Sequence, residues 1–284
     1  MMMFWLLVSI IFTTAIILIL IRFNDTYADH QQWRRLRATQ PTNPATYDPT
    51  IVDGLPEPAR RFFNFAISPG TPLLTVAEID MGGQFSLGSL ENPNYQTMEA
   101  RQILAAPTGF VWQLRLPNWV SGSDFGSDSS SWTRFRIFCF VPVARLGGDT
   151  NHRRAAFGRY VAEAVFWTPA ALLPGSGVVW DMIDGNSARV TVSRGALSQS
   201  VDVYVNASGQ PVVVQFMRWN NANPEKIYGY QPFGGYLSDF REVQGFTIPF
   251  RVEAGNQFGT DTYFPFFRAQ LKAVNFPANT RQSP

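Results

Sequence analysis

The sequence predicts a mainly β (α+β) fold: a curved antiparallel sheet, or half-barrel, of about eleven strands. One or two helices plug it, and a single N-terminal transmembrane helix precedes it. Three observations predict this. Hydrophobicity alternates with period two over many short runs after residue 73, which is typical of strands with one buried face. These runs follow one another through tight turns, so neighbouring strands are expected to be antiparallel. Residues 159–192 combine an amphipathic helix, a proline stop and a return to the alternating pattern.

The distribution of apolar residues and prolines along the sequence divides the chain into four parts. We expect a transmembrane anchor at 1–22, a juxtamembrane helix and Pro-rich linker at 23–54, a β-rich half-barrel domain at 55–276 and a tail at 277–284. A chain of 284 residues is long enough to bury the core of one large β domain.

Composition excludes several classes of function. The chain contains 24 Phe, 8 Trp and 9 Tyr, and its formal net charge of +2 is too small to indicate a nucleic-acid partner. The single cysteine, Cys139, excludes a disulfide framework and a cysteine-based metal site. Since it sits in an apolar run, we expect it to be buried. We predict no metal and no cofactor.

The N-terminus predicts a membrane anchor. Residues 1–21 carry no charged side chain, and about 20 apolar residues are enough to cross a bilayer as a helix. A cleaved signal peptide would need a basic segment before the apolar run and a small-residue cleavage site after it, and the sequence has neither. We therefore expect an uncleaved single-pass anchor. Its predicted bilayer contacts are Phe4, Trp5, Leu6, Ile16, Leu20, Trp33, Arg34 and Arg35.

The arginines after the apolar span indicate on which side of the membrane the folded domain lies. Arg22, Arg34, Arg35 and Arg37 follow it and nothing basic precedes it, which by the positive-inside rule favours a cytoplasmic domain. A periplasmic domain is the alternative. A short helix at 26–38 is expected either to lie on the membrane surface or to be a solvated linker. Five prolines then predict an extended linker at 40–58.

Within the domain, helices are predicted at 55–67 and from residue 152 to the stop at Pro169. Residues 121–131, rich in Gly, Ser and Asp, predict a mobile loop, and a Phe-rich segment at 264–267 precedes the last strand. The expected strands lie at 74–87, 98–104, 109–116, 132–140, 178–182, 188–192, 201–205, 211–219, 235–243, 246–253 and 270–275.

Two carboxylates have alternative environments. Glu163 is either an exposed helix residue paired with Arg159 four positions back, or a carboxylate that points at the sheet and meets an inward arginine. Glu242 either faces water at a strand edge or lies inside the domain beside Phe240, where it would need a partner such as Arg136 or Arg115.

Four motifs resemble those of a widespread bacterial family of unknown function. They are LPEPARRFF at 55–63, APTGFVW at 106–112, RYVAEAVFWTPAALLPGSGVVWDMID at 159–184 and SDFREVQGFTIPFR at 238–251. The resemblance covers roughly 55–274. It implies a bacterial chain, hence anchorage in the inner (cytoplasmic) membrane, and a fold similar to the lipoprotein-carrier (LolA/LolB-like) half-barrels. It implies no reaction. The chain departs from the family pattern at 121–131 and 258–267.

No catalytic motif is present: G-x-S-x-G, H-E-x-x-H, G-x-G-x-x-G after a strand and the P-loop are all missing from the sequence. We therefore predict a protein that is not an enzyme. It either binds a lipid or other apolar ligand beside the bilayer, or is an accessory subunit that contacts other membrane proteins through its span and exposed aromatics. The direction in which the aromatics point discriminates between these hypotheses. The candidate cavity residues are Trp112, Phe138, Tyr160, Glu163, Trp167, Trp180, Phe240 and Glu242.

Overall fold

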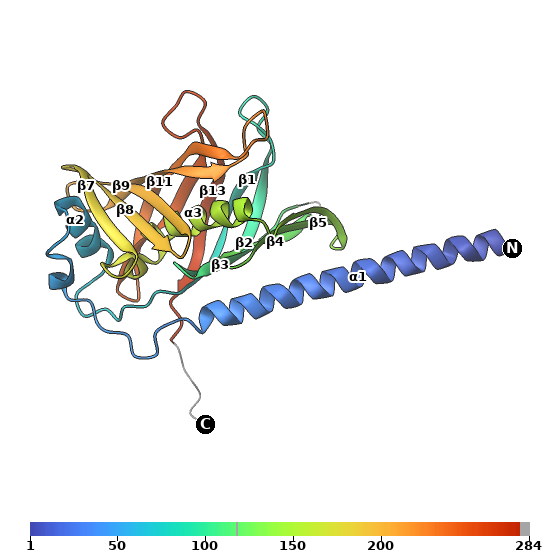
Figure 1. Ribbon diagram of the computed structural model, residues 1–284, viewed down its shortest axis with the longest axis horizontal. Coiled ribbons are helices and arrows are strands. Elements are labelled where there is room, and N and C mark those ends of the chain that lie inside the picture. Colours follow the sequence, from blue (N-terminus) through green and yellow to red (C-terminus); the bar gives the residue numbers. More distant parts are fainter. Residues whose placement is uncertain (118, 279–284) are drawn as a thin grey trace.

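The structure, a computed structural model, describes residues 1–117 and 119–278. They form one open antiparallel sheet of thirteen strands with helices on both faces (Figure 1). The predicted curved antiparallel sheet is confirmed, with thirteen strands instead of about eleven. The helices are α1 (Met2–Arg37), η1 (Pro49–Val52), α2 (Glu57–Ala66), α3 (Thr150–Trp167) and η2 (Pro169–Leu172). The strands are β1 (Ala77–Ser86), β2 (Tyr95–Ala105), β3 (Gly109–Arg115), β4 (Ser121–Ser127), β5 (Ser131–Ile137), β6 (Val141–Gly147), β7 (Val178–Asp184), β8 (Ser187–Arg194), β9 (Leu197–Val205), β10 (Pro211–Asn220), β11 (Gly229–Val243), β12 (Phe246–Asn256) and β13 (Phe264–Asn275).

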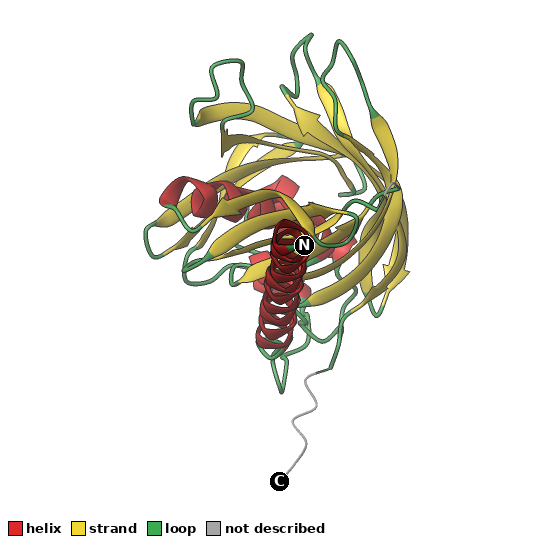
Figure 2. Ribbon diagram, turned by 90° about the vertical axis from the view of Figure 1, so that its right-hand side faces the viewer, coloured by secondary structure: helices red, strands yellow, loops and turns green. Residues whose placement is uncertain are grey.

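Two meanders build the sheet. The first runs from β1 out to the edge strand β6, and the second runs from the other edge strand, β7, inward to β13. β13 pairs with β1 in the middle, with Glu78 opposite Asn275. Figure 2 shows how strongly the sheet curves, as an open twisted sheet of more than about ten strands does.

The helix α3 connects the two meanders and covers the concave face. Its N-terminus is capped by Asp149, whose carboxylate accepts a hydrogen bond of 2.9 Å from the backbone N–H of His152. It contacts β4, β9 and β10. Its buried face carries Phe157, Tyr160 and Trp167, and it ends before Pro169, as predicted.

Residues 121–131 are not a loop. Strand β4 covers 121–127 and β5 begins at 131, with only the turn 128–130 between them, so the prediction of a mobile loop over the whole segment was wrong. Small side chains serve packing here: a Cβ added at Gly126 would lie 2.5 Å from the Cβ of Ala156 on α3. The composition that indicates a loop therefore lets a helix approach the sheet closely. The segment 264–267 is likewise part of β13 and continuous with the predicted last strand.

The helix α1 is one continuous helix of 36 residues. Its C-terminal part packs on the outer face of the sheet, where Leu36 joins a small core with Val76, Val111 and Phe125. A separate helix on the membrane surface and a solvated linker helix are therefore both wrong. The physical reason is the stripe formed by Asp25, Asp29 and Leu36, all of which are buried.

Asp25 is the centre of a charge cluster. Its carboxylate, 1% exposed, lies 2.6 Å from Arg136 and Arg145 and 3.2 Å from Arg134. One turn later, Asp29 accepts hydrogen bonds from the Ser123 hydroxyl (2.9 Å) and the Trp132 indole (3.2 Å). Burial raises the pKa of Asp29 above its ordinary value, although these hydrogen bonds lower it. The two carboxylates fix α1 to β4, β5 and β6.

The N-terminal part of α1 stands apart from the sheet (Figure 1). It is long and apolar enough to cross a membrane, and its apolar window is entirely unburied. An N-terminal signal sequence meets the same criteria of length and composition.

The segment between α1 and α2 lies against the domain. Tyr47 is 2% exposed, and Gln40 donates to the carbonyl oxygens of Val76 (3.1 Å) and Pro277 (3.0 Å). These contacts hold the segment against the domain. Of the predicted tail, residues 279–284 lie outside the described part of the chain.

Replacing Asp25 with Asn is expected to lower the free energy of unfolding by about 2 kcal/mol, because three neighbouring guanidinium groups lose their shared anion. Thermal unfolding of the purified full-length protein in mild detergent measures this. Asp53→Asn, on the surface, is the matched control. Equal melting temperatures for both variants would contradict a stabilising role of the cluster.

Candidate ligand cavity

A cavity of about 240 Å³ lies between α3 and the concave face of the sheet. Most of its lining is apolar, including Ala162 from α3, Leu237 from β11 and Ala254 from β12. Nine aromatic residues line it: Phe85, Trp112, Phe135, Phe166, Trp167, Phe216, Phe233, Phe266 and Phe267.

Six of these rings form one connected set, namely Phe85, Trp112, Phe216, Phe233, Phe266 and Phe267. Phe85 lies between Trp112 and Phe266, with ring centroids 6.0 and 5.6 Å away, and Phe216 lies 5.4 Å from Phe233. Much of the aromatic content thus turns inward, including Phe266 and Phe267 from the Phe-rich segment.

A partly buried ion network forms the polar end of the cavity. Arg159 of α3 donates to Asp124 of β4 and to Glu163, each at 2.7 Å. Thr133 donates to Asp124 at 2.8 Å, and Gln102 donates to Glu163 at 2.6 Å. Burial favours the neutral form of Arg159, but Glu163 and Asp124 together raise its pKa. Both alternatives for Glu163 were partly right, since it pairs with Arg159 and also points at the sheet.

Arg218 of β10 lines the same cavity from another strand. Its guanidinium lies 4.8 Å from the Phe233 ring centroid, and its Nε is buried without a hydrogen-bond partner among the described residues. Burial, helped by the like charge of Arg159 and opposed by Asp124 and Glu163, lowers the pKa of Arg218 to about 10. A buried polar atom without a partner is costly, and Arg218 is therefore the residue here best placed to meet a ligand.

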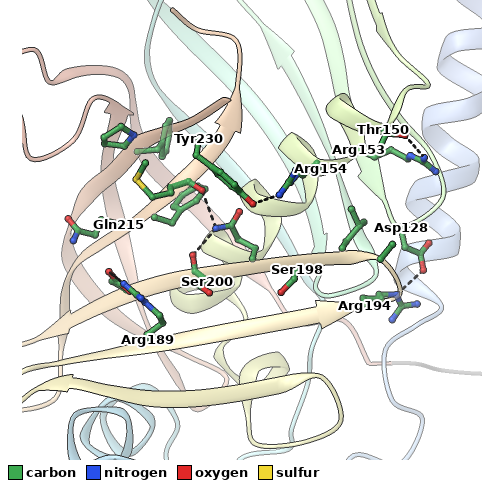
Figure 3. Close-up of a pocket in the computed structure, with 18 of the residues that line it drawn as sticks. Asp128, Thr150, Arg153, Arg154, Arg189, Arg194, Ser198, Ser200, Gln215 and Tyr230 are labelled. Atoms are coloured by element: carbon green, nitrogen blue, oxygen red, sulfur yellow. Dashed lines mark hydrogen bonds and ion pairs between the residues drawn. The ribbon is translucent and has the colours of Figure 1, made fainter. Parts of the chain in front are cut away.

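A wide groove of about 1160 Å³ is shown in Figure 3. It shares Phe216 and Phe233 with the cavity. Its arginines already have partners. Arg194 pairs with Asp128 at 2.8 Å, and Arg189 pairs with Asp202 at 2.6 Å.

Arg154, in the same groove, donates to the Tyr230 hydroxyl (Figure 3). The arginines of the groove are therefore engaged within the protein.

Of the residues predicted for the cavity, Trp112, Glu163 and Trp167 line it. Tyr160 lies beneath the lining, against Phe110 and Phe157 at centroid distances of 5.9 and 5.2 Å. Burial raises its pKa.

The other four predicted residues lie elsewhere. Trp180 packs on Phe62 and Phe63 of α2, because the strand after η2 turns toward that helix. Phe240 packs against Phe65. Phe138 is exposed in the β5–β6 turn. Glu242 is exposed on β11, so the water-facing alternative holds, and Arg136 instead pairs with Asp25.

Sequence reasoning missed Arg218 and Phe233. The available signal was the alternation of β10, which places Arg218 on the same face as Val214 and Phe216. Among the described residues, no group of three or more His, Cys, Asp or Glu side chains is arranged to hold a metal ion.

Fold and site together define a class of protein: a half-barrel that encloses an apolar cavity behind one crossing helix. The chain belongs to a family of unknown function, DUF6544, whose model matches residues 45–269. The sequence-based resemblance to an uncharacterised family is thus confirmed. A search of curated proteins found no match.

Two solved structures are similar in outline. One is a LolA superfamily protein from Nitrosomonas europaea, with 8% identity and a TM-score of 0.43 over 76% of this chain and 90% of that one. The other is a candidate outer membrane lipoprotein-sorting protein domain from Vibrio parahaemolyticus, with 7% identity and a TM-score of 0.38 over 82% and 94%. Similarity at this level supports no conclusion about ligand or activity.

Replacing Arg159 with Met is expected to destabilise the domain by about 3 kcal/mol, because two buried carboxylates lose their shared cation. Chemical denaturation of the purified protein measures the change. Arg153→Met on the same helix is the control, since Arg153 makes only exposed hydrogen bonds to Ser129 and Thr150. If both variants unfold at the same denaturant concentration, the network does not stabilise the fold.

Proposed function

We propose that this protein is a membrane-anchored, non-enzymatic domain that binds a lipid or other apolar ligand between α3 and the concave face of its sheet. One observation carries the proposal: nine aromatic residues line a single cavity between the helix and the sheet. Ligand sites are typically apolar pockets with a few convergent polar groups, and this cavity has Arg159, Glu163 and Arg218 among its lining.

The dimensions favour a chain-like ligand. At about 240 Å³ the inner cavity is smaller than most sites for a whole small molecule. It can take one apolar segment, and the adjoining groove of about 1160 Å³ can hold the remainder. An acyl chain with a larger polar end suits this combination.

Arg218 supports a particular orientation of the ligand. Asp124, Glu163, Arg159 and Arg218 together carry no net charge when all four are ionised. A neutral acceptor, such as an ester carbonyl oxygen, would satisfy the guanidinium without adding charge to this buried cluster. We therefore place an acceptor oxygen of the ligand against Arg218.

The anchor is the second part of the proposal. The apolar residues of α1 would cross the inner membrane of a bacterial cell once, and the arginines that follow would keep the domain in the cytoplasm. Continuity of α1 supports this, since the same helix that leaves the apolar segment packs on the sheet through Asp25, Asp29 and Leu36.

The cavity is tested by filling it. Ala254→Phe is expected to reduce co-purifying lipid about tenfold, because the added ring occupies the space of the ligand. The full-length protein is purified from its native membrane in gentle detergent, and extracted lipid per chain is quantified by mass spectrometry.

Ala207→Phe, in an exposed turn, is the matched control. An equal amount of lipid per chain in the two variants would contradict the ligand hypothesis. Stoichiometric membrane proteins in the wild-type preparation, with no cavity-dependent lipid, would favour the alternative of an accessory subunit in a larger complex.

Arg218→Met is expected to stabilise the empty protein and to weaken ligand binding. The pKa of Arg218 is lower in the folded protein than in the unfolded chain. Protonation at pH 7 therefore destabilises the fold, and this effect begins to fall only as pH rises above about 10 and is gone only above the pKa of the unfolded chain.

Removing the charge should raise the free energy of unfolding by about 1–3 kcal/mol at pH 7, while co-purified lipid falls. Denaturation and lipid quantification on the same samples measure both effects. A variant that is less stable and equally loaded with lipid would contradict the assignment.

A further inference from the structure

Two turns at one end of the sheet expose large apolar side chains side by side. Trp119, in the β3–β4 turn, is 70% exposed. Phe138 and Phe140, in the β5–β6 turn, are 59% and 46% exposed. The turns are adjacent because Ser121, just after the first, pairs with Arg136, just before the second.

The backbone of these turns is unusual. Trp119, Phe138 and Cys139 have φ values of 64°, 48° and 68°. Hairpins that need two successive residues in this left-handed region normally use Asn-Gly or similar pairs, since bulky side chains there are strained. Strain at exposed aromatic residues points to a use outside the folded domain. Cys139, expected to be buried, is half-exposed here.

The position of these turns along α1 identifies what they meet. Asp29 contacts Trp132 of β5, and Asp25, one turn nearer the N-terminus, contacts Arg134 and Arg136. The strand therefore advances toward its turn as α1 advances toward its apolar segment. The next helical turn brings Ile21 and Leu18 to this side, and both are half-buried, whereas their neighbours are exposed. Figure 1 shows β5 beside α1 in this way.

One crevice brings the two turns and the helix together. Arg22, Trp119 and Cys139 all line it. Arg22 is the first charged residue after the apolar segment. The exposed aromatics are therefore level with the end of that segment, where a spanning helix passes from hydrocarbon to headgroups.

We infer that Trp119, Phe138 and Phe140 insert into the interfacial layer of the bilayer and form a second membrane contact beside α1. This inference rests on the proposed anchoring of α1. Aromatic rings are the side chains enriched at that depth, and Arg22 and Arg115 near the turns suit anionic headgroups. Two contacts on one rigid helix and sheet would hold the domain in one orientation on the membrane.

Cys139, the single cysteine, provides the probe. The full-length protein is labelled there with an environment-sensitive fluorophore and reconstituted into phosphatidylcholine–phosphatidylglycerol vesicles with nitroxide lipids of different depth. We expect shallow nitroxides to quench this label about threefold more than a label at the far side of the domain.

That control is Cys139→Ser with Ala207→Cys, in the turn whose Gly209 lies against α2. In a second variant, Trp119→Ser with Phe138→Ser and Phe140→Ser, quenching at Cys139 should fall to the control value while the melting temperature is kept or raised.

The outcomes separate the inference from the anchor. A protein that floats with the vesicles but shows control-level quenching at Cys139 overturns the second contact and leaves the anchor standing. A label shielded from iodide yet unquenched by lipid nitroxides also overturns it, since the turns then meet protein, for example a second copy. A protein that does not float with the vesicles overturns the anchor and this inference together.

Discussion

The concave face of a single thirteen-stranded sheet must be covered, and the helix that covers it is short. α3 has 18 residues and is therefore about 27 Å long. It packs mainly over β4, β9 and β10, and of the strands β11 to β13 it contacts chiefly β12. Aromatic side chains extend into the remaining space and do not fill it. The cavity therefore exists because one short helix covers only part of the concave face of a strongly curved sheet.

The charged groups on the two faces of the sheet are neutralised by opposite arrangements. On the outer face, three arginines share Asp25, and on the inner face, two carboxylates share Arg159. Each arrangement satisfies the groups that burial would otherwise destabilise. Arg218 departs from this rule, because its Nε has no hydrogen-bond partner among the described residues. Ionisable groups whose burial destabilises the fold are more often found at functional sites than in structural cores.

Local sequence patterns predicted helices and strands well where the spacing of apolar residues reflects which face of the element is buried. The alternation of β10 and the stop at Pro169 both follow from side-chain periodicity and proline geometry, and both agree with the structure. The prediction failed at 121–131, where a composition rich in Gly, Ser and Asp was interpreted as a mobile loop. Ser123 and Gly126 indicate a loop by residue type, yet their small size is what allows α1 and α3 to approach β4.

The site was predictable only in part, for a related reason. Trp112 and Trp167 could be chosen as cavity residues because aromatic residues on apolar faces have few other places to go. Trp180 fits the same description but packs on α2. Periodicity gives the face of an element, and not the partner that covers it. That partner depends on long-range topology, here the docking of α2 near β7.

Strands β4 and β5 link the two faces. Ser123 holds Asp29 of α1 on the outside, and the next residue, Asp124, holds Arg159 on the inside. On β5, Thr133 donates to Asp124 from between Trp132 and Arg134, which contact Asp29 and Asp25. Neighbouring residues of one strand are separated by only about 3.4 Å. A shift of α1 against the sheet would therefore disturb the polar end of the cavity, so the arrangement that fixes the domain to its N-terminal helix also fixes the orientation of the cavity relative to that helix.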